Sequence, residues 1–113
     1  MTTFSEYEEL AKKTAMYPTD ILSAISYLAL GLNGEAGEVA EKVKKLIRDN
    51  DDLEEALVEK QMELAYELGD VLWYISQLCS ELGISMEEVA TMNIRKLSSR
   101  KEREKITGSG DFR

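Results

Sequence analysis

The chain contains a single proline, Pro18. Because proline disrupts the interior of a helix, the absence of any later proline leaves the rest of the chain free to form long helices. Leucine, alanine, glutamate, lysine and methionine dominate the sequence, and these residues have high helix propensities. Runs in which β-branched residues alternate with polar ones, which are typical of strands, are scarce. These features predict an all-α fold, and a chain of 113 residues leaves room for one domain with one core, over residues 1–113.

Capping signals divide this domain into four predicted helices. A capping residue begins a helix by accepting hydrogen bonds from its first backbone N–H groups, and glycine or proline ends one. We expect the core at about 20–104, a flexible tail at 105–113, and a four-helix bundle-like fold completed by homo-oligomerisation, because so short a chain buries a limited fraction of its surface. The predicted ranges are 3–16, 20–48, 52–82 and 85–104; the caps are Thr3, Asp20, Asp52 and Ser85, with Gly83 ending the third helix.

Composition narrows the classes of function. The formal net charge is −8, whereas a nucleic-acid-binding module would present a basic face. No apolar run approaches the ~20 residues that span a bilayer, and the first residues lack the basic-then-apolar pattern of a signal peptide. The single cysteine, Cys79, suits a reducing compartment, and its apolar neighbours predict burial. We therefore expect a cytoplasmic protein that binds neither nucleic acid nor membrane.

Two pairs of acidic residues lie at the edges of the predicted apolar faces. Glu35 and Glu38 are three residues apart on the second helix, and Glu67 and Asp70 repeat this spacing on the third. Residues three apart share one side of a helix, so antiparallel packing of the two helices would bring both pairs together. Converging carboxylates repel one another unless a cation lies between them, and ligands made only of oxygen suit Mg²⁺ or Mn²⁺.

Three alternatives to a Mg²⁺ or Mn²⁺ site can be weighed against these acidic pairs. The chain has no histidine, which excludes a Glu-x-x-His di-iron site and argues against a zinc site. Ordinary solvated acids are the alternative that stays open, since 22 of the 113 residues are acidic.

The last helix carries polar residues on the side that we expect to face inward. Asn93, Lys96 and Arg100 lie among or beside its apolar positions. Either the charged ends extend to the surface, or this side faces a site that contains phosphates. Lys42 and Lys45, which flank the acidic pair of the second helix, favour the phosphate interpretation.

Glycines and aromatic residues surround the acidic pairs. Gly31, Gly34 and Gly37 lower the helix propensity of the second helix, so they indicate close helix packing, a break in the helix or space for a bound molecule. Tyr74 lies on the same edge as the acidic pair of the third helix and is a candidate for contact with a nucleobase. Trp73 points away from the apolar face, so we expect it at an interface between copies.

Taken together, these residues resemble a known family, the MazG-like, all-α nucleotide pyrophosphohydrolases. The similarity covers residues 20 to 104 approximately and includes the Asn93–Leu97 segment of the last helix. The family signature, Glu-x-x-Glu followed by Glu-x-x-Asp, is similar to two segments of this chain: Glu35-Ala36-Gly37-Glu38 and Glu67-Leu68-Gly69-Asp70.

The resemblance implies hydrolysis between the α- and β-phosphates of a (deoxy)nucleoside triphosphate, which yields a nucleoside monophosphate and pyrophosphate. It also implies a homodimer or homotetramer whose active sites are built partly across subunits. Our own prediction for the biological role is house-cleaning of the nucleotide pool, although the sequence does not separate removal of damaged nucleotides, trimming of dNTP pools and action on a guanosine signalling nucleotide. Mg²⁺ is the implied cofactor, with Mn²⁺ as a substitute. The implied metal ligands are Glu35, Glu38, Glu67 and Asp70, and the implied substrate contacts include Asn93 and Lys96.

Two further roles are our own hypotheses. Glu38 is the candidate base that takes a proton from the attacking water. The positive charges that would hold the leaving pyrophosphate are those of Lys42, Lys45, Lys96 and Arg100.

Two alternatives to this function stay open. A related helical enzyme with the same acidic pairs acts on phosphoribosyl-ATP, and nothing in the sequence separates the two activities firmly. A catalytically inert helical interaction module is the alternative from another class, and it predicts that Mg²⁺ neither stabilises the fold nor supports hydrolysis.

Overall fold

The computed structural model describes residues 1–102 and shows four α-helices with no strand in that range. The all-α expectation is therefore confirmed for the described part of the chain. The predicted end of the last helix at 103–104 and the predicted tail at 105–113 lie outside the described residues. The helices are α1 (Phe4–Lys12), α2 (Ile21–Asp49), α3 (Leu53–Leu82) and α4 (Met86–Glu102).

Each helix begins at the predicted cap. The Asp20 carboxylate accepts a hydrogen bond from the Ser23 backbone N–H at 3.1 Å, and Thr3 and Asp52 accept equivalent bonds at the starts of α1 and α3. At α4 the capping is reciprocal: Ser85 Oγ accepts from the Glu88 N–H at 3.0 Å, while the Ser85 N–H donates to the Glu88 carboxylate at 3.3 Å. These bonds satisfy backbone donors that have no partner within the helix.

The first helix is shorter than predicted. It ends at Lys12 rather than near position 16, because the bonds that follow have the tighter three-residue spacing. The Lys13 N–H donates to the Leu10 carbonyl at 3.2 Å, and the Thr14 hydroxyl donates to the Ala11 carbonyl at 2.7 Å. The chain then crosses to α2 as a loop.

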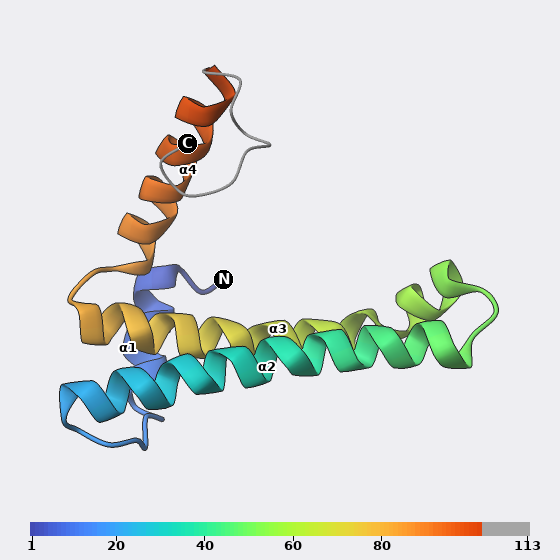
Figure 1. Cartoon of the computed structure of the whole chain (residues 1–113), viewed down its shortest axis with the longest axis horizontal. Coiled ribbons are helices and arrows are strands. Elements are labelled where there is room, and N and C mark those ends of the chain that lie inside the picture. The colour runs from blue at the N-terminus through green and yellow to red at the C-terminus, as the bar shows by residue number, and fades with distance from the viewer. Residues whose placement is uncertain (103–113) are drawn as a thin grey trace.

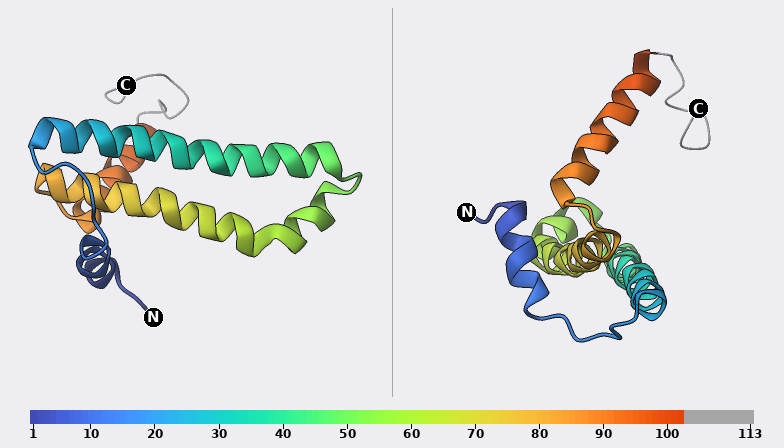
Figure 2. Two further views of the ribbon diagram at one scale, coloured as in Figure 1. Left: turned by 90° about the horizontal axis from the view of Figure 1, so that it is seen from below. Right: turned by 90° about the vertical axis from the view of Figure 1, so that its left-hand side faces the viewer.

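The two long helices, α2 and α3, form an antiparallel pair along the length of the molecule (Figures 1 and 2). Helix α1 lies across α3 near its C-terminal part, and α4 contacts α1 and α3 but, within residues 1–102, not α2. Apolar side chains fill the contact between the long helices, with Ala24 and Leu28 of α2 fully buried. Cys79 of α3 is buried as predicted.

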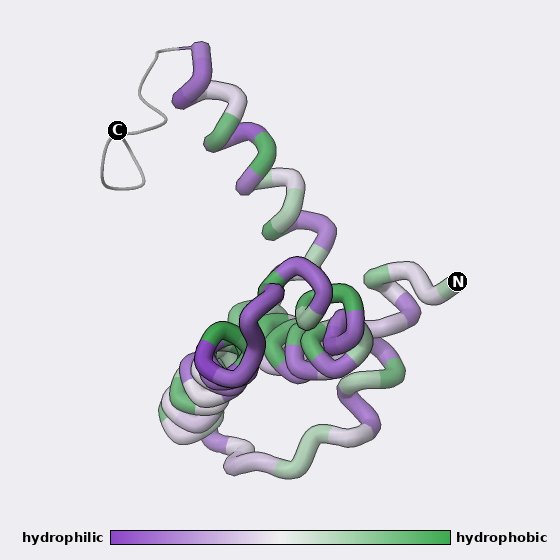
Figure 3. Tube along the Cα trace, turned by 90° about the vertical axis from the view of Figure 1, so that its right-hand side faces the viewer, coloured by the Kyte–Doolittle hydropathy of each residue, from purple (hydrophilic) through white to green (hydrophobic). Residues whose placement is uncertain are grey.

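A single chain does not enclose a compact four-helix core. Figure 1 shows α4 extending away from the α2–α3 pair, and the radius of gyration is 17.1 Å. A compact domain of this length would have a radius of gyration of about 13 Å. Large apolar side chains stay in solvent, among them Leu22, Leu30 and Tyr66, each at least three-quarters exposed. Hydrophobic residues also recur between hydrophilic ones along α4 (Figure 3).

Among residues 1–102, no helix combines the length and the apolar character needed to cross a membrane.

Candidate functional site

Antiparallel packing of α2 and α3 brings three of the predicted acidic residues together. One carboxylate oxygen from each of Glu35, Glu67 and Asp70 lies within 4.8 Å of the other two. Glu35 and Glu67 are half-buried at the helix contact, and Asp70 is exposed. The cluster therefore has one side against the helices and one side open to a ligand.

The electrostatics of this cluster favour a cation. Burial raises the pKa of the Glu35 carboxyl, and the charges of Asp70, Glu67 and Glu38 raise it further. Each of these effects is an energetic cost of holding the carboxylates in their ionised form. Because the donors are all carboxylate oxygens, the group fits a hard divalent cation such as Mg²⁺ or Mn²⁺.

Glu38 lies outside this close group. It is exposed on α2, three residues after Glu35, and its charge contributes to the raised pKa of Glu35. An exposed carboxylate beside a metal site is free to contact water, which a fully coordinated one is not. The role of Glu38 as ligand or base stays a prediction.

Lysines of α2 lie next to the carboxylates. The Lys42 ammonium is 3.7 Å from a carboxylate oxygen of Glu67, so the pair joins the two helices. Lys45 is 3.7 Å from a carboxylate oxygen of Glu41, on the same helix. Lys42 and Lys45 also line a cavity of about 260 Å³ between the end of α2 and the start of α3, together with Lys60, which was not predicted from the sequence.

Tyr74 packs on a glycine one turn from the cluster. A Cβ atom added to Gly31 would overlap the Tyr74 ring, so the ring occupies the space that any other residue would fill. No comparable neighbour lies near Gly34 or Gly37. Of the three interpretations of this glycine-rich segment, close packing holds for Gly31, and α2 runs through all three positions without a break.

Aromatic residues surround Tyr74. Trp73 meets it edge to face with ring centroids 4.9 Å apart, and its indole N–H donates to the Thr14 hydroxyl at 2.8 Å. Tyr17 stacks on Tyr27 at 6.0 Å, and the Tyr17 hydroxyl donates to the Glu81 carboxylate at 3.0 Å. These contacts give Trp73 a packing role within the chain that we did not expect, and its role at an interface stays a prediction.

Two further tyrosines interact with residues of this region and were not predicted from the sequence as part of the site. Burial raises the pKa of Tyr7 on α1, and the charge of Asp70 on α3 raises it further. Tyr27 is a hydrogen-bonding neighbour that helps raise the pKa of Tyr74. The spacing of Tyr27, Gly31 and Glu35, each one turn apart on α2, could have identified Tyr27, whereas Tyr7 depends on how α1 docks.

The predicted substrate contacts of the last helix do not reach the cluster within one chain. Asn93, Lys96 and Arg100 belong to α4, which makes no contact with α2 among the described residues. Asn93 is exposed, Lys96 is half-buried and Arg100 is buried.

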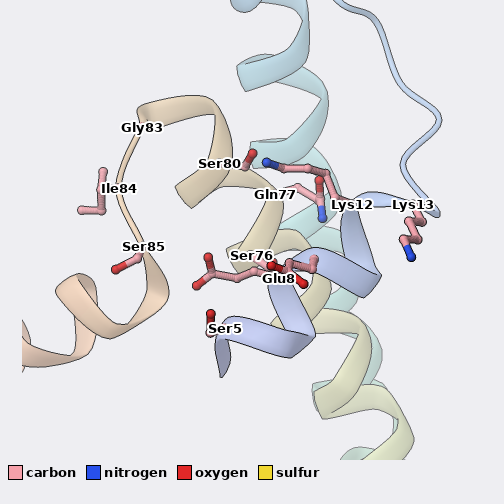
Figure 4. A pocket seen from close by; sticks show the side chains of 11 residues that line it. Ser5, Glu8, Lys12, Lys13, Ser76, Gln77, Ser80, Gly83, Ile84 and Ser85 are labelled. Atoms are coloured by element: carbon pink, nitrogen blue, oxygen red, sulfur yellow. The ribbon is translucent and has the colours of Figure 1, made fainter. Parts of the chain in front are cut away.

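A larger cavity, of about 620 Å³, lies between α1, the end of α3 and the turn into α4, and none of the predicted site residues lines it (Figure 4). At its edge the Glu8 carboxylate accepts a hydrogen bond from the Met86 backbone N–H at 2.8 Å, so α1 holds the start of α4. Ser76 is buried against this cavity, and its hydroxyl has no hydrogen-bond partner among the described residues.

Comparisons with known proteins agree with the geometry. A family model described as the MazG nucleotide pyrophosphohydrolase domain matches residues 23–104, which include the four acidic residues but not α1. The chain is 45% identical to the Gene 37 protein of Mycobacterium phage L5 over 111 residues, covering 95% of this chain and 96% of the phage protein. It is 38% identical to YvdC of Bacillus subtilis strain 168 over 71 residues, covering 60% of this chain and 67% of YvdC.

No solved structure matches the chain. The family match spans well over half of the sequence and contains both acidic motifs. The chain therefore belongs to the MazG nucleotide pyrophosphohydrolase family.

Proposed function

We propose that this protein hydrolyses (deoxy)nucleoside triphosphates between the α- and β-phosphates, releasing a nucleoside monophosphate and pyrophosphate in house-cleaning of the nucleotide pool. The observation that carries the proposal is the convergence of Glu35, Glu67 and Asp70 from two helices to within 4.8 Å. This cluster lies inside the segment that matches the pyrophosphohydrolase family. The proposed ligands of Mg²⁺, or of Mn²⁺ in its place, are Glu35, Glu38, Glu67 and Asp70.

The residues around the cation have separate tasks in this proposal. When bound, the cation supplies charge that offsets the phosphate oxygens and lowers the pKa of nearby water. The exposed Glu38 carboxylate accepts the proton of the attacking water. Lys42, already held beside the carboxylates by Glu67, offsets charge on the leaving pyrophosphate, with Lys45 next to it.

Self-association completes the site in this proposal. The extended α4 and the exposed Leu22, Leu30 and Tyr66 support it, because one chain leaves too much apolar surface in water for a stable domain. A second copy, in a homodimer or homotetramer, would bring Asn93, Lys96 and Arg100 of its own α4 to the carboxylates. This arrangement explains why polar residues interrupt the apolar side of α4.

A product analysis tests the proposed function. The purified protein is incubated with Mg²⁺ and a panel of dNTPs and NTPs, and the products are separated by anion-exchange chromatography. We expect a nucleoside monophosphate and pyrophosphate in equal amounts, with no diphosphate, and no products when EDTA replaces Mg²⁺.

Different outcomes would count against the proposal. A nucleoside diphosphate with orthophosphate would place the cleavage at the wrong bond. Hydrolysis of phosphoribosyl-ATP, with no turnover of any dNTP or NTP, would replace the proposed substrate. Absence of turnover and of any cation-dependent rise in melting temperature would favour an inert interaction module.

A further inference from the structure

The long helices pack closely where Gly31 of α2 meets the Tyr74 ring of α3, beside the carboxylates. A Cβ atom built on Gly31 would overlap three atoms of the Tyr74 ring, with Cδ1 only 2.7 Å away. Real Cβ atoms do not approach ring carbons so closely, so the ring is seated directly on the α2 backbone. Glycine is required at position 31 for this contact, although its helix propensity is low.

The contact lies one helical turn from the candidate metal ligands on both helices. Glu35 follows Gly31 by four residues on α2, and Asp70 precedes Tyr74 by four residues on α3. Because the helices are antiparallel, both steps lead in the same direction along the pair (Figure 2). The separation of the helices at Gly31 and Tyr74 thus constrains the separation of Glu35 and Asp70.

The Tyr74 ring is itself held in place. Trp73 packs against it edge to face at an interplanar angle of 82°. Burial raises the pKa of Tyr74, and the neighbouring Tyr27 and the charge of Glu35 raise it further, so its hydroxyl lies near both side chains. A ring engaged by Gly31, Trp73 and Tyr27 has less freedom to turn toward a nucleobase than its place in the sequence suggests.

We infer that Tyr74 is a positioning residue, whose ring, seated on Gly31, sets the spacing of Glu35 and Asp70 for a divalent cation. The inference rests on the proposed function, because it assigns Tyr74 a task within the proposed metal site. It replaces the expectation that Tyr74 contacts the base.

Cation titration without nucleotide tests this inference. Mn²⁺ and Mg²⁺ are titrated into the wild type and into the variants Gly31→Ala, Tyr74→Leu and Tyr74→Phe. Binding is followed by melting temperature and by the emission of Trp73, the single tryptophan, which contacts Tyr74. The matched control is Gly34→Ala, which adds the same methyl group to the same helix where no neighbour lies within 4 Å.

The expected results distinguish a role of the Tyr74 ring from a role of its hydroxyl group. Gly31→Ala and Tyr74→Leu each weaken cation binding about tenfold, which is typical when residues that orient metal ligands are changed. Tyr74→Phe keeps the ring and stays within about threefold of the wild type, as does Gly34→Ala. The double variant Gly31→Ala with Tyr74→Leu binds no worse than either single variant, since the smaller leucine leaves room for the added methyl group.

Contrary results would overturn the inference. Wild-type cation affinity in both Gly31→Ala and Tyr74→Leu would show that the contact does not position the ligands. Unchanged cation affinity with a raised KM for nucleotide in Tyr74→Leu would make Tyr74 a substrate contact. The two proposals can also fail separately. If cation binding follows the expected order among the wild type and the variants but the wild type hydrolyses no nucleotide, the proposed reaction is wrong and the positioning role of Tyr74 stands.

Discussion

The Glu35 carboxyl carries much of the electrostatic cost of the site. Its pKa in the folded protein lies above the ordinary value, first because of burial and then because of Asp70, Glu67 and Glu38. A raised folded-state pKa stabilises the fold fully below the unfolded pKa, and this contribution is lost as the pH rises through the folded-state pKa. At neutral pH the ionised Glu35 is therefore destabilising unless a cation is bound.

Replacing Glu35 with glutamine should consequently stabilise the protein when no metal is present. We expect Glu35→Gln to raise the free energy of unfolding at pH 7 in EDTA by about 0.5 kcal/mol, the scale of repulsion between neighbouring like charges. The advantage should shrink as the pH falls through the raised pKa of Glu35, because the wild-type carboxyl then takes up its proton. Urea unfolding at several pH values measures both effects.

Saturating Mg²⁺ should reverse this order. Mg²⁺ that binds only the folded protein stabilises the wild type. The Glu35→Gln variant has lost one of the negatively charged groups that would coordinate the cation, so Mg²⁺ stabilises it less. Greater stability of the wild type over Glu35→Gln in EDTA at pH 7 would contradict the electrostatic interpretation of the cluster.

Glu38 is exposed, and of the four predicted metal ligands it is the one that lies outside the close carboxylate group. If it is the base, Glu38→Gln should lower kcat at least ~100-fold, the usual contribution of a positioned base, with an unchanged melting temperature. The control is Glu59→Gln, an exposed carboxylate on α3 that lies outside the close carboxylate group. Full activity of Glu38→Gln would remove Glu38 from the chemistry.

At the scale of helices, local signals predicted the boundaries well because capping is a local interaction. Asp20, Asp52 and Ser85 each bond a backbone N–H three residues later, so the sequence alone contains both partners. The end of α1 was missed because the Thr14 hydroxyl takes part in the last turn and also accepts the indole N–H of Trp73. That second bond depends on a residue 59 positions away.

The candidate site was predictable only in part for the same reason. Helical spacing predicted that Glu35, Glu67 and Asp70 would face one another, and the structure brings them together. Spacing could not show which carboxylate stays outside, because that depends on the rotation of α2 against α3. The packing of the Tyr74 ring on Gly31 likewise depends on the register between α2 and α3, which local spacing does not determine.

Gly83 ends α3 in a left-handed conformation, with φ of 71°. A side chain is strained there, so Gly83→Ala should lower the free energy of unfolding by about 1 kcal/mol. Gly34→Ala, in open space within α2, should instead raise it by up to about 1 kcal/mol, because alanine favours the helix. Thermal or urea unfolding of both variants measures the difference, and equal effects would contradict the assigned conformation of Gly83.

At the scale of the whole molecule, the position of α4 separates the proposed halves of the site. The carboxylates lie on α2 and α3, whereas Asn93 and Lys96 lie on a helix that makes no contact with α2 among the described residues. Glu8 of α1 holds the first turn of α4, which stabilises this extended arrangement. Under the proposed function, the substrate contacts of α4 therefore come from a second copy of the chain.

Subunit complementation tests that requirement. Glu35→Gln and Lys96→Ala should each be nearly inactive, because one lacks a metal ligand and the other a phosphate contact. After the two variants are unfolded together and refolded as a mixture, half of the dimers carry one of each, and one of the two sites in such a dimer is intact. Activity should therefore return to about a quarter of the wild-type value. If all contacts came from one chain, every site would keep a defect and the mixture would stay inactive. An inactive mixture would therefore contradict a site shared between copies, and so would full activity of Lys96→Ala alone.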